Sequence, residues 1–567
     1  MCAAGTSAED RLSSRTDKRR PISLTNKPRY FPTIVCALLV VATACTKTPA
    51  PLGIHFVDGG IIIENPDDSS ESALPDIKTR HSLGADRELL ISDWEAGDSY
   101  RFGAGGSKIA PVVAEIFALS SFDLGDANID MPDTSLAFSA DGRRLAIGSF
   151  GGDLLMTDPL AGDILWQKRI PDGFAKRLVF SADGKRLYVG SQSPDADLLA
   201  LDAHKGKELW RVKLSEHVQS SRLPPGNDRY GIYELPAAQR MLLLPGDRLL
   251  IAASHAWTQA DGERRNSGRV LLYGADGEQL AAWPTDGAAA VSIPALTASA
   301  DGHQIAFACS LSAAPTAGEQ HEPGGVYLLD YPAGASAFTL RWGGAPPPVD
   351  PYPTAMLWSA LSLSPDGSVL MAGWADGRAR FYPSDAQGPG LPPPLQEANP
   401  GLPLSIDGIP VASGVGFGSG ARSGFAFQTT LSLVPWTADT SAESPPAPHP
   451  RADTLWVRDA GGAPLWSYSG PWSMGGLQML DLPDDSARLY ALAGSRSDTR
   501  KDLFGLLAWT LPAGPEPQPR LFRTQGPPFF ELSAVATELG PLVAIVETPT
   551  HDKAGRRRGR YRVQVLR

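Results

Sequence analysis

The side chains best suited to covalent chemistry in this chain are few and widely spaced. The chain has four cysteines, Cys2, Cys36, Cys45 and Cys309. Cys45 directly follows an apolar run that ends in the small residues Thr43 and Ala44, whereas Cys309 lies inside the apolar stretch IAFACS. A cysteine in an apolar strand usually acts as a small core side chain. We therefore expect Cys309 to be buried and any thiol modification to occur at Cys45.

The histidines show no spacing typical of a compact metal site. They are His55, His81, His204, His217, His255, His303, His321, His449 and His551. No two of them lie three to five residues apart, as the ligands of such sites usually do. The chain also lacks a haem-attachment Cys-x-x-Cys-His motif, a P-loop and a G-x-S-x-G nucleophile elbow. We predict no catalytic, cofactor-binding or metal-binding residue.

Residues 1–44 have the three parts of a secretory signal peptide. Basic residues precede the apolar run FPTIVCALLVVATA, which ends directly at Cys45. This run is shorter than the roughly 20 residues that a membrane-spanning helix needs. The sequence VATA before the cysteine resembles the bacterial lipobox, which implies that Cys45 is acylated. An ordinary secretory signal with a chance cysteine, or a buried helix, is the alternative.

The segment after Cys45 is rich in Gly, Asp and Ser and predicts a flexible tether over residues 45–110. Thr46 stands where lipoproteins retained in the inner membrane carry Asp. The resemblance therefore implies a lipid anchor in the outer membrane. Removal of residues 1–44, with seven Lys/Arg and three Asp/Glu, changes the net charge from −11 to −15. A protein with this negative net charge repels the phosphates of nucleic acids, so we expect no nucleic acid partner.

Two linked motifs recur from about residue 135 onward. The first is a tight Asp-Gly turn between apolar strands, at Asp141, Asp183, Asp301 and Asp366. The second has an Asp, a Gly and an aromatic residue spaced by four, as in Asp158, Gly162 and Trp166. It recurs at Asp202, Gly206 and Trp210, and again at Asp330, Gly334 and Phe338. The repeat period of the first two copies is typical of a four-stranded propeller blade.

The second motif resembles the quinoprotein-like (PQQ-like) repeat LDAxxGxxLW, and the first resembles the WD-repeat families. The resemblance implies an all-β chain with a β-propeller over residues 111–567. We predict eight four-stranded blades, with seven as the alternative. The tail at 530–566 supplies only about three strands, so residues 112–122 are expected to add the fourth and close the ring.

The longest connections between the predicted strands all belong to one class. They are residues 215–237, 255–268, 311–323, 343–358, 386–407 and 436–453. Each is expected to join a second strand to a third, or one blade to the next, and these connections share one face of a propeller. Long loops on a rigid scaffold commonly bind partners.

The expected function is therefore that of a non-enzymatic, lipid-anchored scaffold without a cofactor. It would bind a protein or another cell-envelope component through its loop-rich face. The alternative is a periplasmic quinoprotein-like oxidoreductase or a lactonase-type hydrolase. A convergent set of Asp, Glu, Asn or His at the central channel would favour the enzyme.

Overall fold

The computed structural model describes the strands of the chain and many of their connections. The described residues are 53–57, 60–64, 79–83, 88–93, 98–103, 118–124, 133–218, 234–258, 264–310, 324–346, 357–374, 378–398, 405–406, 409–412, 415–429, 432–435, 447–448, 454–469, 474–494, 504–512, 519–538, 540–551 and 557–567. Within these residues the structure is β-strand and turn, with one short 3-10 helix, η1 (Leu214–His217). None of their helices is long and apolar enough to cross a bilayer.

The chain divides into two compact units. The first comprises residues 1–72, 83–89 and 102–109, and the second comprises residues 73–82, 90–101 and 110–567. Five strands precede residue 110: β1 (Gly53–Val57), β2 (Gly60–Glu64), β3 (Thr79–Leu83), β4 (Glu88–Asp93) and β5 (Asp98–Gly103). β1 pairs with β2, and β3, β4 and β5 form a second sheet. The expectation of a flexible tether over residues 45–110 did not include these strands.

The strands from β7 to β22 form four successive antiparallel units of four strands each. Their bounds are β7 (Ser135–Phe138), β8 (Leu145–Gly148), β9 (Asp153–Asp158) and β10 (Asp163–Arg169); β11 (Phe174–Phe180), β12 (Arg186–Gln192), β13 (Asp197–Asp202) and β14 (Glu208–Lys213); β15 (Ala237–Leu244), β16 (Arg248–Thr258), β17 (Arg264–Tyr273) and β18 (Gln279–Trp283); β19 (Ser292–Ala298), β20 (Gln304–Ser310), β21 (Gly325–Asp330) and β22 (Thr339–Gly344). A single pair, Gln192 with Ala237, joins the second unit to the third.

Four further units complete the series among the described residues. They are β23 (Leu357–Leu363), β24 (Val369–Trp374), β25 (Ala379–Pro383) and β26 (Gln396–Ala398); β29 (Val415–Ala421), β30 (Gly424–Thr429), β33 (Thr454–Arg458) and β34 (Pro464–Ser469); β35 (Met474–Asp481), β36 (Ala487–Ala493), β37 (Gly505–Leu511) and β38 (Arg520–Arg523); β39 (Pro528–Thr537), β40 (Gly540–Glu547), β43 (Arg562–Leu566) and β6 (Ala118–Asp123).

Short strands also occur inside the long connections. β27 (Ser405–Ile406), β28 (Ile409–Ala412), β31 (Ser432–Pro435) and β32 (Ala447–Pro448) form one small sheet, and β41 (Thr550–His551) pairs with β42 (Arg557–Arg558). These elements lie outside the repeating series.

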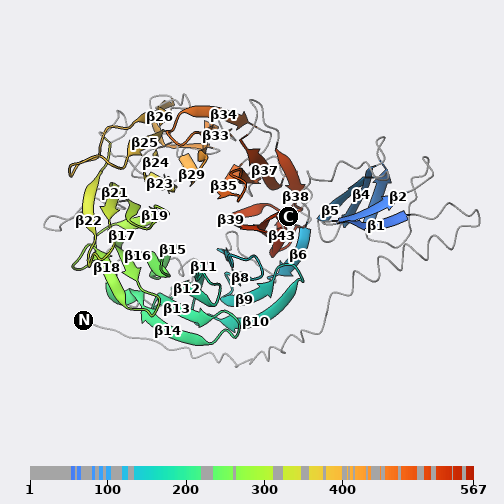
Figure 1. Cartoon of the computed structure of the whole chain (residues 1–567), viewed down its shortest axis with the longest axis horizontal. Helices are drawn as coiled ribbons and strands as arrows, with labels where there is room; N and C mark the ends of the chain where they lie inside the picture. Colours follow the sequence, from blue (N-terminus) through green and yellow to red (C-terminus); the bar gives the residue numbers. More distant parts are fainter. Residues whose placement is uncertain are drawn as a thin grey trace, which may run out of the picture. The chain divides into compact units, whose positions relative to one another are not determined.

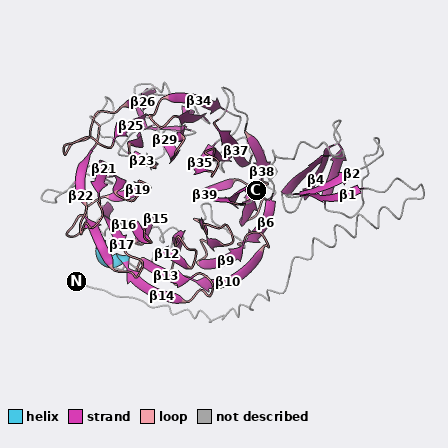
Figure 2. Cartoon of the chain, in the orientation of Figure 1, coloured by secondary structure: helices cyan, strands magenta, loops and turns pink. Residues whose placement is uncertain are grey.

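The first strand of each unit contacts the first strands of its two neighbours. These contacts run β7, β11, β15, β19, β23, β29, β35, β39 and back to β7. Figure 1 shows β15, β19, β23, β35 and β39 nearest the centre, with β14, β22, β26 and β34 at the rim. Figure 2 shows the same units as strands throughout. The fold is the predicted all-β propeller, built from four-stranded antiparallel units.

The last unit takes one strand from the N-terminal side of the repeats, as the sequence predicts. β43 pairs with β40 on one side and with β6 on the other. The Tyr561 hydroxyl lies 2.6 Å from the Thr134 hydroxyl, and the backbone N–H of Phe150 donates to it at 3.1 Å. Both ends of the repeat region are therefore joined in one sheet, and this sheet is hydrogen-bonded to the first unit.

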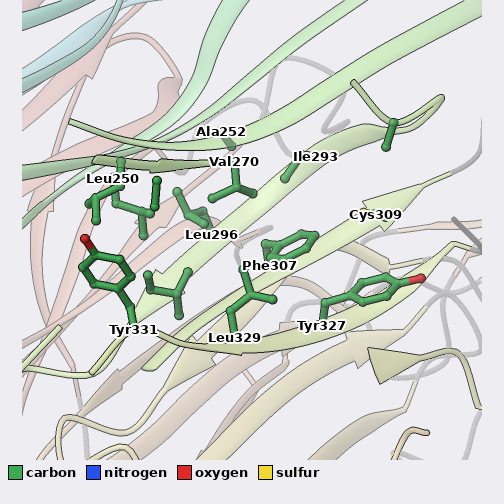
Figure 3. Close-up of a cluster of buried hydrophobic side chains, with 14 of the residues drawn as sticks. Leu250, Ala252, Val270, Ile293, Leu296, Phe307, Cys309, Tyr327, Leu329 and Tyr331 are labelled. Carbon is green, nitrogen blue, oxygen red and sulfur yellow. The ribbon is translucent and has the colours of Figure 1, made fainter. Parts of the chain in front are cut away.

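The core lies between neighbouring units, because the apolar residues of the middle strands point toward the adjacent sheet. Figure 3 shows one such layer, in which Leu250 and Val270 face Phe307 and Leu329. Cys309 belongs to this layer and is 1% exposed, which confirms the expected burial. Apolar burial of this kind is the main stabilising contribution to such sheets.

The predicted Asp-Gly turns have one geometry in all four copies. In the first copy the Ser139 hydroxyl donates to the Asp141 carboxylate at 2.6 Å, and the backbone N–H of Arg143 donates to the same oxygen at 3.0 Å. Gly142 follows with a φ of 67°, a conformation that favours glycine. The turns at Asp183, Asp301 and Asp366 repeat these bonds.

One predicted connection is assigned wrongly. Residues 386–407 were expected to lie between two units, but β26 falls inside this range and pairs with β25. Residues 384–395 therefore join a third strand to a fourth. No local pattern predicts β26, because this strand has three residues and is mostly polar. The other five predicted connections join the expected strands.

Candidate functional site

A register shift recurs near the start of the innermost strands. In seven of the eight, all except β7, the pairing with the second strand shifts within the first few residues. In β11 the shift lies between Ala175 and Arg177, and in β15 between Ala238 and Arg240. A β-bulge adds an unpaired residue and changes where the neighbouring side chains point. These strands thus present side chains that a regular strand would direct elsewhere.

These strand starts share one face with the longest connections. Each innermost strand begins where the chain enters from the preceding unit, at residues 214–236 before β15 and 345–356 before β23. In an antiparallel unit, the connection from the second to the third strand returns to the same end. We call this end of the sheets the loop-bearing face.

Five charged residues from four consecutive units gather at this end. Asp133 precedes β7, Lys176 and Arg177 lie on β11, Arg240 lies on β15 and Glu531 lies on β39. We call these five residues the inner-strand cluster. With three cations and two carboxylates, the cluster has a formal charge of +1, in a chain whose net charge is −11.

The cations of this cluster differ in their partners. The Lys176 ammonium forms an ion pair with the Asp133 carboxylate and lies 5.4 Å from the centre of the Phe174 ring. Arg177 donates to the backbone oxygens of Gln239, at 2.9 Å, and Lys176, at 2.7 Å. Arg240 donates to the Gln239 oxygen at 3.0 Å. Among the described residues, neither guanidinium forms an ion pair.

The pKa values show that these charges act on one another. The pKa of Arg240 is lowered to about 10, chiefly by burial and then by Arg177, with Glu531 and Asp133 acting in the opposite direction. Burial raises the pKa of Glu531, and Arg177 and Arg240 oppose that shift. Burial also lowers the pKa of Lys176, against the effect of Asp133. The five groups therefore form one electrostatic unit across four sheets.

Two histidines lie at the same end of the neighbouring second and third units. The His255 ring stacks on Trp257 with 4.3 Å between ring centres, and its Nε2 donates to the backbone oxygen of Glu234 at 2.9 Å. The Tyr273 hydroxyl lies 3.0 Å from Nε2 of His217. Burial lowers the pKa of both histidines. In the described part of the chain, no three His, Cys, Asp or Glu side chains are grouped so that they could hold a metal ion.

The sequence singled out Cys45, and this residue lies outside the described residues. The inner-strand cluster was not predicted. A signal existed, since the starts FAKRLVF and AAQRMLLL carry charged residues in strands that are otherwise apolar. What the sequence could not show is that the contacts between innermost strands bring these positions together from four units.

The fold defines the class of this protein: it is a β-propeller of four-stranded antiparallel units, with repeats similar to those of the PQQ-like and WD-repeat families. Residues 150–310, from the end of β8 to the end of β20, match a family described as outer membrane protein assembly factor BamB. This match covers less than half of the chain, so we report it as a similarity. No curated protein matches the chain.

Several solved structures are similar to most of the chain at low identity. The computationally designed Ika8 protein is 13% identical, covering 78% of this chain and 99% of its own, with a TM-score of 0.44. The C-terminal WD40 domain of Sif2 is 10% identical, covering 80% of this chain and 98% of its own, with a TM-score of 0.42. Sqt1 of Saccharomyces cerevisiae is 11% identical, covering 80% of this chain and 98% of its own, with a TM-score of 0.45.

Proposed function

We propose that this chain is a non-enzymatic scaffold, anchored to the outer membrane through an acylated Cys45, that binds a protein of the cell envelope through its loop-bearing face. The apolar run that ends at Cys45 supports the anchor. The similarity of residues 150–310 to an outer membrane protein assembly factor supports an envelope setting.

The observation that carries the binding role is the inner-strand cluster on the loop-bearing face. Polar side chains presented by a rigid sheet, surrounded by long connections, are typical of a recognition surface. Three of the five groups are cations, whereas a hydrolase of the lactonase type would need Asp, Glu, Asn or His ligands there. The mixed charge therefore supports binding over the enzymatic alternative.

Site-specific photo-crosslinking in the native envelope tests this proposal. A photoreactive amino acid would replace Pro171 or Asp286, which are exposed in connections between units on the loop-bearing face. The matched control positions are Arg143 and Lys205, which are exposed in turns on the opposite face. We expect a discrete crosslinked protein from the first pair of positions and none from the second.

The opposite pattern would contradict the proposed binding face. Crosslinks only from Arg143 or Lys205 would move the interface to the face with the short turns. If no position on either face yields a crosslinked protein in intact cells, the scaffold role itself is wrong.

A further inference from the structure

The unpaired guanidiniums of the inner-strand cluster suggest which chemistry the loop-bearing face recognises. Arg177 and Arg240 are each half-buried. Each is held in place by backbone oxygens, and both donate to the oxygen of Gln239. A guanidinium has five N–H donors. Arg177 uses two of its donors and Arg240 one in bonds to the described residues.

Within the part of the chain that the structure describes, no carboxylate forms an ion pair with either arginine. Asp133 is engaged by Lys176, whose side chain is 10% exposed. Glu531 raises the pKa of Arg240, against the lowering by burial, yet it forms no ion pair among the described residues. A partly buried cation without a counter-charge is costly, and an incoming anion offsets that cost.

We propose that Arg177 and Arg240 form a binding site for carboxylate groups of a partner protein, with Glu531 as the competing internal carboxylate. This inference rests on the proposed scaffold function and names the chemistry of its ligand. Planar guanidiniums bind carboxylates through paired N–H donors, so two of them on adjacent strands can hold neighbouring acidic side chains or a chain-terminal carboxylate.

Glu531 gives the site a second property. It belongs to β39, on the other side of the ring-closing contact from β11 and β15, and its charge acts on both arginines. A partner carboxylate must therefore compete with the field of Glu531. Removing the Glu531 charge is expected to strengthen binding, whereas removing the arginines weakens it. A structural role for the cluster would not produce these opposite signs.

Peptide binding to the full-length protein tests the proposal. The fluorescent probes are a hexaglutamate peptide with an amidated C-terminus, a hexaglutamine peptide with a free C-terminal carboxylate and an amidated hexaglutamine peptide as the blank. Fluorescence anisotropy at low salt measures affinity. We expect one or both carboxylate probes to bind above the blank, and the tighter probe identifies whether side-chain or terminal carboxylates are the source.

The variants separate the site from general electrostatics. The double variant Arg177→Gln, Arg240→Gln should weaken binding at least about tenfold. The control variant Arg143→Gln, Lys205→Gln removes the same charge from the opposite face and should change binding less than about twofold. Glu531→Gln should bind more tightly than the wild type, a gain that only a folded protein can show.

Two results would overturn the inference. One is the absence of binding above the blank by the wild type, and the other is equal weakening by the two double variants. A discrete crosslink from Pro171 or Asp286 together with either result would leave the scaffold role standing and remove only the carboxylate site.

Discussion

The Glu547 carboxylate lies at the centre of a buried polar network in the ring-closing unit. Arg562 donates to its Oε2 from Nε at 3.2 Å and from a terminal nitrogen at 2.9 Å, and Gln564 donates to the same oxygen at 3.1 Å. The backbone N–H groups of Gly526 and Arg560 donate to Oε1 at 3.1 and 3.4 Å. A single side chain thus satisfies donors from β43 and from two turns.

Removing Glu547 should destabilise the propeller strongly. The side chains of Glu547 and Arg562 are 0% and 5% exposed, so Glu547→Ala would remove a carboxylate that binds a buried cation. We expect a loss of about 3–5 kcal/mol in the free energy of unfolding. Urea unfolding followed by tryptophan fluorescence measures it.

The matched control for Glu547 is an exposed ion pair. Asp276 pairs with Arg186 at 3.4 Å, and its side chain is 86% exposed. Asp276→Ala should change the free energy of unfolding by less than about 1 kcal/mol. Equal effects of the two substitutions would show that the buried network does not hold the ring-closing unit together.

His255 should make stability depend on pH. Burial lowers its pKa below the ordinary value of about 6.5, so the folded state favours the neutral ring. The stabilising contribution is present above pH 6.5 and is lost as the pH falls, because the unfolded state then binds more protons. We expect the loss to be at most about 1.4 kcal/mol per pH unit for this one group.

Thermal unfolding between pH 7.5 and 5.5 measures this effect. His255→Gln should reduce the pH dependence of the midpoint, whereas replacing the exposed His551 with Gln should leave it unchanged. A wild-type slope that persists in His255→Gln would assign the dependence to other groups.

At the scale of the element, the aromatic residue of the second motif joins neighbouring units. The Trp210 indole N–H donates to the Ala275 oxygen at 2.9 Å, and its ring covers Gly277, where a Cβ would approach within 2.9 Å of the indole. Trp166 makes the same contacts one unit earlier, with the Ala203 oxygen at 2.9 Å and with Gly206. The glycine of this motif thus accommodates the tryptophan of the preceding unit.

Substitution of Trp210 should therefore lower the free energy of unfolding more than substitution of the preceding residue, Leu209. We expect Trp210→Ala to lower the free energy of unfolding by about 3 kcal/mol, the lower end of the range for a buried large aromatic residue. Leu209 is 47% exposed on the same strand, and Leu209→Ala should change it by less than about 0.5 kcal/mol. Chemical denaturation compares the two variants, and similar losses would contradict the inter-unit role.

The elements that the sequence predicts well are those with local chemical signals. The Asp-Gly turns and the Asp, Gly and aromatic spacing are local, and both are found where expected. β26 was missed because its residues Gln396–Ala398 carry no apolar alternation, and its place depends on pairing with β25. The inner-strand cluster was missed for a related reason, since Glu531 and Arg240 are 291 positions apart in sequence and meet only when the ring closes.

For the whole molecule, the closing contacts decide which parts of the chain act together. β6 and β43 place residues near 120 and 565 in one sheet, and β39 contacts β7. This closure supplies β6 as the fourth strand of the last unit, next to β43. It also brings Glu531 into the field of Arg177 and Arg240, so the proposed binding site depends on an intact ring.

The anchor proposed for this ring determines where its partner must be sought. Cys45 precedes the whole propeller, so acylation there would hold the propeller at a membrane surface, whereas a freely secreted chain would meet different partners. The intact mass of the protein extracted from bacterial membranes, compared with that of a Cys45→Ala variant, tests this directly. We predict the mass of residues 45–567 plus acyl groups, with the variant released from the membrane. An unmodified mass that retains residues 1–44 would contradict the lipid anchor.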